Sequence, residues 1–342
     1  MKGNDYHEQV NIHNNMKLRD IQASLPLFIY EFFRGIEQTT SSRTRIAYAY
    51  DLKVFFNYLK AYNKDFKSIE IEDLEVECLD LIKPDHLEMY LEHLNYYSND
   101  NGHDQHTNKE RGKARKMATL RSLYRYFYKK QKIKTNPSIL VDMPKIHDKV
   151  ITRLEIDEVA KLLDEVESGD HLTTKQKQYH KVTKDRDLAL LTVLLGTGIR
   201  VSECVGLNIT DIDFDLNGMR ILRKGGTEVI IYFGTEVQVA LKIYLEKRRK
   251  VIPCVGHEDA LFLSMQDKRL SVRSIQNLVN KYAKLVTKVK NISPHKLRST
   301  YGTNLYRETG DIYLVADVLG HRDVNTKKKH YAEIEDERRR MA

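Results

Sequence analysis

The sequence predicts a mainly α-helical protein of the α+β class, with two domains and a small antiparallel β-sheet in the second. Apolar residues recur at helical spacing through most of the chain. Residues 211–233 instead alternate between apolar and polar types and contain two turn signals, Asn217-Gly218 and Gly225-Gly226, which indicate three short strands. The length of 342 residues exceeds what one hydrophobic core usually organises, so we expect two domains.

The composition favours a polar, water-soluble protein with a polyanionic partner. Hydrophobic residues make up 41% of the chain and the net charge is +9, which favours nucleic acid as the partner. No apolar run approaches the roughly 20 residues that cross a bilayer, and the N-terminus lacks an apolar signal core. We therefore expect a cytoplasmic protein without a membrane partner. Three widely spaced cysteines form neither a CxxC pair nor a disulfide framework, which favours a reducing compartment.

The N-terminal half is expected to begin with a flexible polar extension over residues 1–16, followed by a helical domain over residues 17–134. One helix is indicated by SSRTRIAYAYDLKVFFNYLKA, where Ser41 or Ser42 offers an N-cap, and another begins at Pro84 in KPDHLEMYLEHL. The segment SNDNGHDQHTN between this second helix and the next indicates a polar loop. The apolar positions expected along the first helix are Ile46, Tyr50, Val54, Phe55 and Tyr58.

A strongly basic helix is predicted between Lys109 and Lys134. This segment carries eleven Lys and Arg residues and one acidic residue, Glu110. Its polar side is either an ordinary solvated face or a surface that follows a DNA backbone, and the lack of interspersed acidic residues favours DNA. Its buried side is expected to consist of Met117, Leu120, Leu123, Tyr124 and Phe127. The residues expected to bind DNA are Lys113, Arg115, Lys116, Arg121 and Arg125.

An extended linker is predicted over residues 135–150, because Pro137 and Pro144 interrupt the helical pattern. The second domain is expected to span residues 151–342 and to begin with a capping box, Thr152 to Glu155, that opens the helix EIDEVAKLLDEV. A buried helix that ends at glycines, KDRDLALLTVLLGTG, precedes the three strands. Four more helices are expected after them, in TEVQVALKIYLEKRRK, SVRSIQNLVNKYAKLVTK, PHKLRSTYGTNLYRE and DIYLVADVLG.

Four short stretches of the second domain carry side chains suited to an anionic transition state. GTGIRVSE places Arg200 and Glu203 on one face of a helix, if a helix starts there. ILRKGG sets a lysine beside a hairpin turn, SPHKLRST sets a histidine and an arginine near the positive end of a helix, and LGHRDVNTKKKHY sets a histidine ahead of a tyrosine. The candidate catalytic residues are Arg200, Glu203, Lys224, His295, Arg298, His321 and Tyr331.

Each stretch also has an ordinary structural explanation. A histidine at a helix start is commonly a cap, an Arg–Glu pair commonly staples a surface, and a lysine beside a Gly-Gly turn keeps a hairpin soluble. The occurrence of all of them together, in this order, favours a catalytic role.

The chemistry explains why such a set would act on DNA. A tyrosine has an unperturbed pKa of about 10, so forming its phenolate at pH 7 costs roughly 4 kcal/mol, a cost that nearby cations lower. Two arginines can bind the non-bridging oxygens of a phosphodiester through their planar forks while charge builds. The departing alkoxide is about as basic as hydroxide, whose parent water has a pKa of ~15.7, so it needs an acid, and Lys224 is placed for that role. This scheme requires no metal or other cofactor.

The motifs GTGIRVSE, HKLR, LGHRDVN and the tyrosine that follows them resemble the tyrosine recombinases, also called phage-type or Xer-type integrases. The resemblance spans residues 150–342. The N-terminal helices are similar to the core-binding domain of that family only in length, helicity and basicity. The resemblance implies that Arg200 and Arg298 bind the scissile phosphate and that Tyr331 forms a transient 3′-phosphotyrosine bond.

The resemblance also implies roles for the other candidates. Lys224 would be the general acid, His295 would assist as acid or base, His321 would stabilise the phosphate and Glu203 would support the site. A C-shaped DNA clamp is implied, formed by the helical core-binding domain and the catalytic domain. The implied assembly is a homotetramer on two paired sites in double-stranded DNA, which exchanges strands through a Holliday junction.

Several functions remain open at this stage. An Xer-like enzyme that resolves chromosome or plasmid dimers, an integrase of a mobile element and a DNA-inverting switch would share this sequence pattern. Among other classes, a type IB topoisomerase uses a similar set of residues, and a catalytically silent DNA-binding or architectural protein would need only the basic surface. Covalent capture of DNA distinguishes the enzymes from the silent protein.

Overall fold

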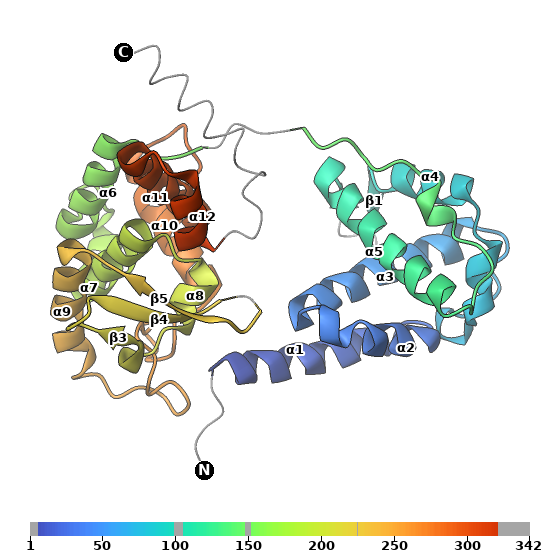
Figure 1. Ribbon diagram of the computed structural model, residues 1–342, viewed down its shortest axis with the longest axis horizontal. Coiled ribbons are helices and arrows are strands. Elements are labelled where there is room, and N and C mark those ends of the chain that lie inside the picture. The colour runs from blue at the N-terminus through green and yellow to red at the C-terminus, as the bar shows by residue number, and fades with distance from the viewer. Residues whose placement is uncertain (1–5, 99–104, 148–151, 224, 321–342) are drawn as a thin grey trace. The chain divides into compact units, whose positions relative to one another are not determined.

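The computed structural model describes residues 6–98, 105–147, 152–223 and 225–320. The chain divides into two compact units, Met1–Asp148 and Lys149–Ala342, each of which is mainly helical (Figure 1). The predicted fold class, mainly α with a small antiparallel sheet, is confirmed. Among the described helices, none is both long enough and apolar enough to cross a membrane.

The described part of the N-terminal unit consists of α-helices, short 3-10 turns and one very small hairpin. Its α-helices are α1 (Tyr6–Gln22), α2 (Phe28–Gly35), α3 (Ser42–Tyr62), α4 (Pro84–His93) and α5 (Glu110–Lys129). The 3-10 turns are η1 (Glu37–Thr39), η2 (Ile71–Asp73), η3 (Val76–Leu81) and η4 (Pro137–Ile139), and the strands are β1 (Tyr97–Ser98) and β2 (Gln105–His106).

The helices expected from apolar spacing form where the sequence predicts them. Ser41 is the N-cap of α3, because its hydroxyl accepts a hydrogen bond from the Thr44 backbone N–H at 3.2 Å, and α4 begins at Pro84. All five apolar residues predicted for the buried face of α5 are at most 1% exposed. The prediction for Tyr50 is wrong: its side chain lies at the surface of α3, where the Lys17 ammonium sits 5.7 Å from the ring centroid.

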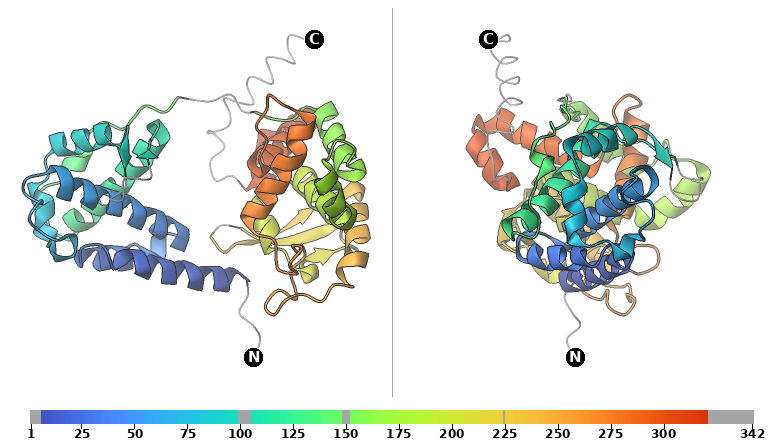
Figure 2. Two further views of the ribbon diagram at one scale, coloured as in Figure 1. Left: turned by 180° about the vertical axis from the view of Figure 1, so that it is seen from behind. Right: turned by 90° about the vertical axis from the view of Figure 1, so that its right-hand side faces the viewer.

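The predicted flexible extension over residues 1–16 is wrong from Tyr6 onward, because these residues belong to α1. The helix runs alongside α3 (Figure 2), with Leu18 and Ile21 in the core near its end and polar contacts along its earlier turns. The Asn14 side chain donates to the Ser42 hydroxyl at 3.1 Å, and that hydroxyl donates to the Asn11 side chain at 3.0 Å. Arg45 of α3 donates to the Asn15 side chain at 3.3 Å. Apolar periodicity does not detect a helix that is attached through asparagines.

The predicted polar loop after α4 also contains regular structure. Strand β1 pairs antiparallel with β2, and Tyr97 lies opposite His106 with 5.4 Å between the ring centroids. A cross-strand pair of rings of this kind stabilises a short hairpin. Residues 99–104, between the two strands, lie outside the described residues.

A buried carboxylate, Asp51, joins α3 to α5. It is 2% exposed and accepts hydrogen bonds from Lys116 at 3.2 Å, from Thr119 at 3.0 Å and from Arg115. The Lys116 side chain is itself 7% exposed. Burying this lysine is tolerable because its charge is paired with Asp51.

The predicted linker begins later than residue 135. Arg121 of α5 donates to the backbone carbonyls of Ser138 at 3.0 Å and Val141 at 2.7 Å. Ser138 is fully buried and Val141 is 2% exposed. Residues up to Val141 therefore pack as part of the N-terminal unit, because Arg121 binds backbone groups there that a free linker would leave to water.

The described part of the C-terminal unit contains helices around a three-stranded sheet. Its helices are α6 (Ile156–Ser168), α7 (Thr174–Thr197), α8 (Val201–Gly206), α9 (Thr235–Arg248), α10 (Val272–Val286), α11 (Pro294–Thr309) and α12 (Ile312–Leu319), with the 3-10 turn η5 (Ile209–Asp211). Its strands are β3 (Ile212–Asp213), β4 (Gly218–Leu222) and β5 (Glu228–Tyr232), in the order β3-β4-β5.

The sheet and the four C-terminal helices agree with the sequence prediction. The turn before β4 uses Asn217 at a positive φ of 49°, and β4 pairs with β5 in an antiparallel register that sets Met219 opposite Ile231. The predicted capping box at Thr152 is wrong. The N-cap of α6 is Glu155, whose backbone N–H donates to the Glu158 carboxylate at 2.8 Å, so the cap lies three residues further along.

Helix α11 passes the end of α7 at a glycine and packs on α12 through a local apolar cluster. Tyr306, Val315 and Leu319 are buried together between α11 and α12. Gly198, which follows α7, has a φ of +61°, and a Cβ atom there would lie 2.3 Å from the Tyr301 ring of α11. Only glycine fits this position, so α7 ends where α11 passes.

We expect Asp51→Ala to destabilise the N-terminal unit by about 3 to 5 kcal/mol, because it leaves Lys116 buried without its counter-charge. Urea unfolding of the full chain, monitored by amide hydrogen exchange of α3 and α5, measures this loss of unfolding free energy. A suitable control is Glu70→Ala in the same unit, which removes an exposed ion pair with Lys60 and should cost less than about 1 kcal/mol. Equal losses for the two variants would contradict the structural role of Asp51.

Candidate active site

Arg200 and Glu203 form the first part of the site at the start of α8. Arg200 is the N-cap of this helix. Its guanidinium donates to one carboxylate oxygen of Glu203 at 2.8 Å, and its backbone N–H donates to the other oxygen at 2.7 Å. The Glu203 side chain is 5% exposed, whereas that of Arg200 is 35% exposed. The buried carboxylate therefore fixes both the backbone and the side chain of an accessible arginine, as the predicted spacing required.

Arg298 reaches the same place from α11. It is 5% exposed, and its guanidinium donates to the Gly198 carbonyl at 2.5 Å and to the Leu319 carbonyl at the end of α12. Arg200 donates to the next carbonyl, that of Gly320, at 3.2 Å. Two guanidinium groups that are 98 positions apart in the sequence thus bind consecutive acceptors in space.

A third arginine, Arg223, binds the same helix end. It directly follows β4, and its guanidinium donates to the Val318 carbonyl at 2.6 Å and to the Asp317 carbonyl at 3.3 Å. Figure 1 shows α8, α11 and α12 in the same part of the C-terminal unit, with the β4–β5 hairpin below them. Arg223 is not among the catalytic candidates predicted from the sequence. Its position immediately before Lys224 and a Gly-Gly turn was the available signal.

The remaining catalytic candidates are placed only in part. His295 lies in the first turn of α11, three residues before Arg298, with an exposed side chain. Lys224, His321 and Tyr331 lie outside the described residues. The structure therefore brings Arg200, Glu203 and Arg298 together, and the catalytic roles of all seven candidates stay predictions.

The basic helix α5 divides the five predicted DNA-binding residues into two groups. Lys116 is buried against Asp51 and Arg121 binds backbone carbonyls, so both have structural roles. Arg115, which also donates to Asp51, and Arg125 are exposed, while Lys113 is half-buried. At about 100° per residue, the exposed residues Arg111, Arg115, Arg125 and Lys129 lie within about 80° of one another. We call these four the basic row.

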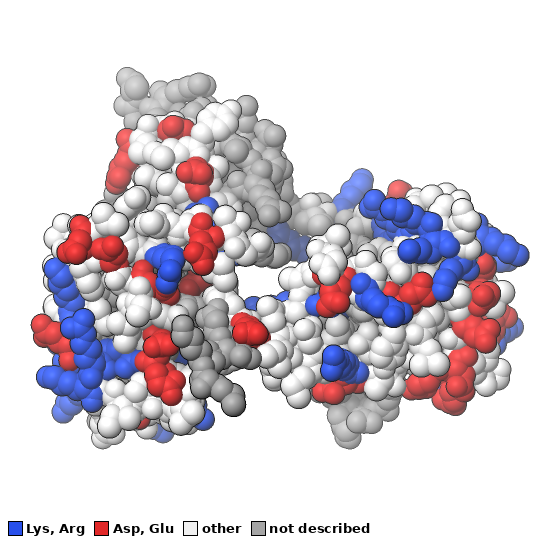
Figure 3. Space-filling model, turned by 60° about the horizontal axis from the view of Figure 1, so that its bottom comes forward, with Lys and Arg blue, Asp and Glu red and all other residues white. Residues whose placement is uncertain are grey.

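Basic and acidic side chains both lie on the surface of the N-terminal unit. Lysine and arginine side chains gather over one part of the visible face, with acidic side chains beside and below them (Figure 3). Arg111 and Lys129 were not among the predicted contacts, because a count of basic residues does not reveal which side of a helix faces the solvent.

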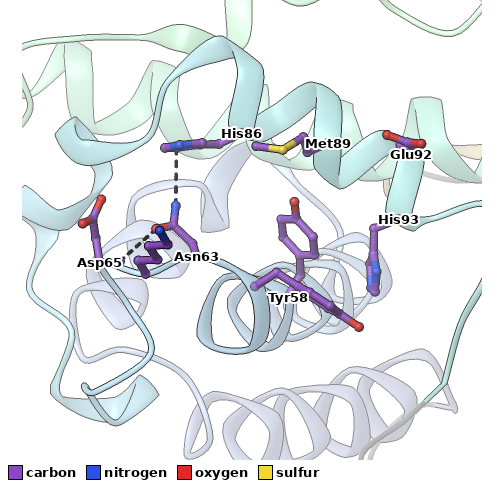
Figure 4. A pocket seen from close by; sticks show the side chains of 9 residues that line it. Tyr58, Asn63, Asp65, His86, Met89, Glu92 and His93 are labelled. Atoms are coloured by element: carbon purple, nitrogen blue, oxygen red, sulfur yellow. Dashed lines mark hydrogen bonds between the residues drawn. The ribbon is translucent and has the colours of Figure 1, made fainter.

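A separate cavity of about 660 Å³ lies in the N-terminal unit (Figure 4). Asn63 and His86 face each other across 3.4 Å at one end, and the ring of His93 lies 4.8 Å from that of Tyr58 at the other. Burial lowers the pKa of His93 and raises the pKa of Tyr58, so both rings are favoured in their neutral forms. Its lining contains none of the predicted catalytic or DNA-binding residues.

Within the described residues, no group of three or more His, Cys, Asp or Glu side chains is arranged to hold a metal ion. The polar groups that the structure brings together at this site are guanidinium donors and the carboxylate that orients one of them. Such donors suit a ligand with several anionic oxygens, above all a phosphate.

Comparison with known proteins places the chain in a family. Residues 152–338, more than half of the chain, match the Phage integrase family. Tyrosine recombinase XerC of Caldanaerobacter subterraneus subsp. tengcongensis is 33% identical over 92% of this chain and 85% of its own length. Tyrosine recombinase XerD of Staphylococcus epidermidis is 31% identical over 87% of this chain and 90% of its own length.

Solved structures share the fold. The XerH site-specific recombinase bound to its difH substrate aligns with a TM-score of 0.61 and 18% identity, covering 96% of this chain and 94% of that one. The Tn1549 transposon integrase in complex with transposon right end DNA aligns with a TM-score of 0.62 and 16% identity, covering 90% of this chain and 97% of that one. The family match and the sequence relatives together show that this chain belongs to the phage integrase family and is an Xer-like tyrosine-type site-specific DNA recombinase.

Proposed function

We propose that this recombinase cleaves and rejoins DNA through a 3′-phosphotyrosine bond at Tyr331, with Arg200 and Arg298 binding the scissile phosphate. The observation that carries the proposal is the convergence of these two guanidinium groups on the adjacent carbonyls of Gly320 and Leu319. Carbonyl and phosphoryl oxygens are both hydrogen-bond acceptors. Donors that already meet at one point can therefore grip two oxygens of a single phosphate.

Burial strengthens this interaction. Arg298 is 5% exposed, so this donor acts in surroundings from which much of the water is excluded, and the carboxylate that orients the more accessible Arg200 is buried as well. Glu203 holds Arg200 from behind through both its guanidinium and its backbone N–H. The arginines are thus oriented before DNA arrives, and little reorganisation is needed as charge builds on the phosphate.

The proposed chemical step is a transfer of the phosphoryl group from a sugar oxygen to tyrosine. The phenolate oxygen of Tyr331 attacks phosphorus and forms a P–O bond, while the bond between phosphorus and the 5′ oxygen of the leaving strand breaks. Lys224 donates a proton to that oxygen, which leaves as a hydroxyl. His295 accepts the phenolic proton, and His321 donates a hydrogen bond to a phosphoryl oxygen. Attack by a 5′ hydroxyl of the partner strand reverses the step and reseals the DNA without ATP.

The partner proposed for the whole chain is double-stranded DNA that carries a specific recombination site. The XerH and Tn1549 integrase structures are complexes with DNA, and the basic row of α5 offers a surface for phosphates here. We propose a homotetramer on two paired sites and strand exchange through a Holliday junction, used either for Xer-like dimer resolution or for integration and excision of a mobile element. The named relatives come from bacteria, and we propose action on DNA in the cytoplasm.

The other functions considered are disfavoured for specific reasons. A silent architectural protein is disfavoured because the relatives that match most of the chain are named recombinases. A type IB topoisomerase would share the chemistry, but the relatives matched over most of the chain are named recombinases.

We expect Tyr331→Phe to bind DNA like the wild type but to form no covalent complex, because the variant lacks the attacking oxygen. Nicked duplexes that tile the DNA flanking the gene and candidate chromosomal sites are mixed with each protein and run on denaturing gels. Tyr313→Phe, which alters an exposed tyrosine of α12, should retain the protein-linked band. A covalent complex in Tyr331→Phe would remove this residue from the mechanism.

We expect Arg298→Ala to slow cleavage by about 10² to 10³-fold, the usual effect of losing one preorganised donor to a developing anion. Arg298→Lys should also be slow, because an ammonium does not reproduce the planar fork that serves two acceptors. The matched control is Arg307→Ala on the same helix, which breaks an ion pair with Glu155 away from the site and should cleave normally. Wild-type cleavage by Arg298→Ala would refute the assignment.

We expect the double variant Arg125→Ala, Lys129→Ala to bind DNA more weakly and with a shallower dependence on salt. Each lost phosphate contact lowers the slope of log K against log salt by about 0.9, so the slope should fall by about 2. Lys161→Ala serves as the control, because the charge of Lys161 is already compensated by Asp157 at 3.4 Å. An unchanged slope in the double variant would show that the basic row does not contact DNA.

A further inference from the structure

Arg223 connects the turn between β4 and β5 to the end of α12. Its backbone closes the turn, since its N–H donates to the Thr227 carbonyl at 2.8 Å and its carbonyl accepts from the Gly226 N–H at 3.0 Å. Its side chain extends to the Val318 and Asp317 carbonyls, 95 and 94 residues away. One residue thus links two segments that are distant in the sequence.

A second, independent observation is the close approach of Arg223 to Gly320. A Cβ atom on Gly320 would lie 2.4 Å from the Nη1 atom and 2.7 Å from the Cζ atom of Arg223. Gly320 also has a φ of +60°, which disfavours other residues. The guanidinium therefore lies against the glycine backbone, next to the carbonyl that Arg200 binds.

The position of this contact gives it a role in the proposed reaction. Lys224, the proposed general acid, is bonded directly to Arg223. The Gly320 and Leu319 carbonyls, in turn, mark where the two phosphate-binding arginines meet. A contact between the turn and these carbonyls therefore connects the segment that contains Lys224 to the place where the phosphate binds.

We infer that Arg223 is a positioning residue for proton donation: it fixes the β4–β5 turn against the end of α12, and efficient proton donation by Lys224 depends on that fixed turn. The inference rests on the proposed function, in which Lys224 is the acid. Arginine suits the task because its planar fork serves two carbonyls and its flat face packs on a glycine, whereas a lysine ammonium offers neither.

The alternative role for Arg223 is purely structural, as a cation that satisfies the carbonyls at the end of α12. The two roles differ in which chemical step they affect. Misplacing the acid slows the departure of an alkoxide but matters little for a leaving group that needs no proton. A disturbed α12 would slow both reactions, because the arginine site would be disturbed as well.

The test uses two suicide duplexes that carry the site captured with wild-type protein, one with oxygen and one with sulfur at the 5′ bridging position of the scissile phosphate. A thiolate, with a parent pKa of about 8.5, leaves without a proton. Arg223→Ala should cleave the oxygen substrate about 10 to 100-fold more slowly than wild type, as expected for a misplaced catalytic group, and the sulfur substrate within a few-fold of wild type. Lys224→Ala should show the same rescue, and Arg298→Ala should be slow on both substrates.

Arg220→Ala is the matched control, because this arginine lies on β4, three residues before Arg223, and pairs with Asp211 at 2.9 Å away from α12. It should cleave both substrates normally. Arg223→Lys, which keeps the charge, should show a smaller defect with the same rescue, and it remains available if Arg223→Ala does not fold. Normal cleavage of the oxygen substrate by both Arg223 variants, or a defect on both substrates while Lys224→Ala is rescued, would overturn the inference alone. Failure of sulfur to rescue Lys224→Ala would instead overturn the proposed role of that lysine.

Discussion

The capture of the carboxyl end of α12 by three arginines is the interaction on which the candidate site depends. The last carbonyls of a helix have no partner within the helix and carry partial negative charge. Here Arg200, Arg223 and Arg298, from three separate segments, bind four successive carbonyls from Asp317 to Gly320. The carbonyl oxygens at a helix end and the oxygens of a phosphate are chemically alike, because both need hydrogen-bond donors. One arrangement therefore completes the fold and prepares the reaction.

Features that depend on local spacing were predictable from the sequence. The buried face of α5, the turn before β4 and the pairing of Arg200 with Glu203 each follow from residues a few positions apart. The first turns of α1 were missed because their attachment to α3 uses asparagine, serine and arginine side chains, and the buried apolar residues Leu18 and Ile21 come only near the end of the helix. The resemblance to a family identified the arginines, but only the folded chain shows that they meet at the end of α12.

The roles of the basic side chains of α5 could also be predicted only in part from the sequence. A count of basic residues in α5 treats Lys116 and Arg121 like their neighbours. In the structure, however, Lys116 is neutralised by a carboxylate 65 positions away, and Arg121 holds the segment that follows η4. These pairings are long-range, so no local pattern announces them. The same limit applies to Arg223, whose carbonyl partners lie more than 90 positions away.

The Asp51 network has a geometric consequence for the basic row. Together with the buried apolar face of α5, the contacts of Asp51 with Arg115, Lys116 and Thr119 set the rotation of this helix about its own axis. The basic row, from Arg111 to Lys129, then runs straight along the helix for about 27 Å, because it spans eighteen residue steps with a rise of roughly 1.5 Å each. At roughly 3.4 Å per base pair, that length corresponds to about eight base pairs of duplex. The contacts of this buried carboxylate thus help to fix the direction in which the basic row faces.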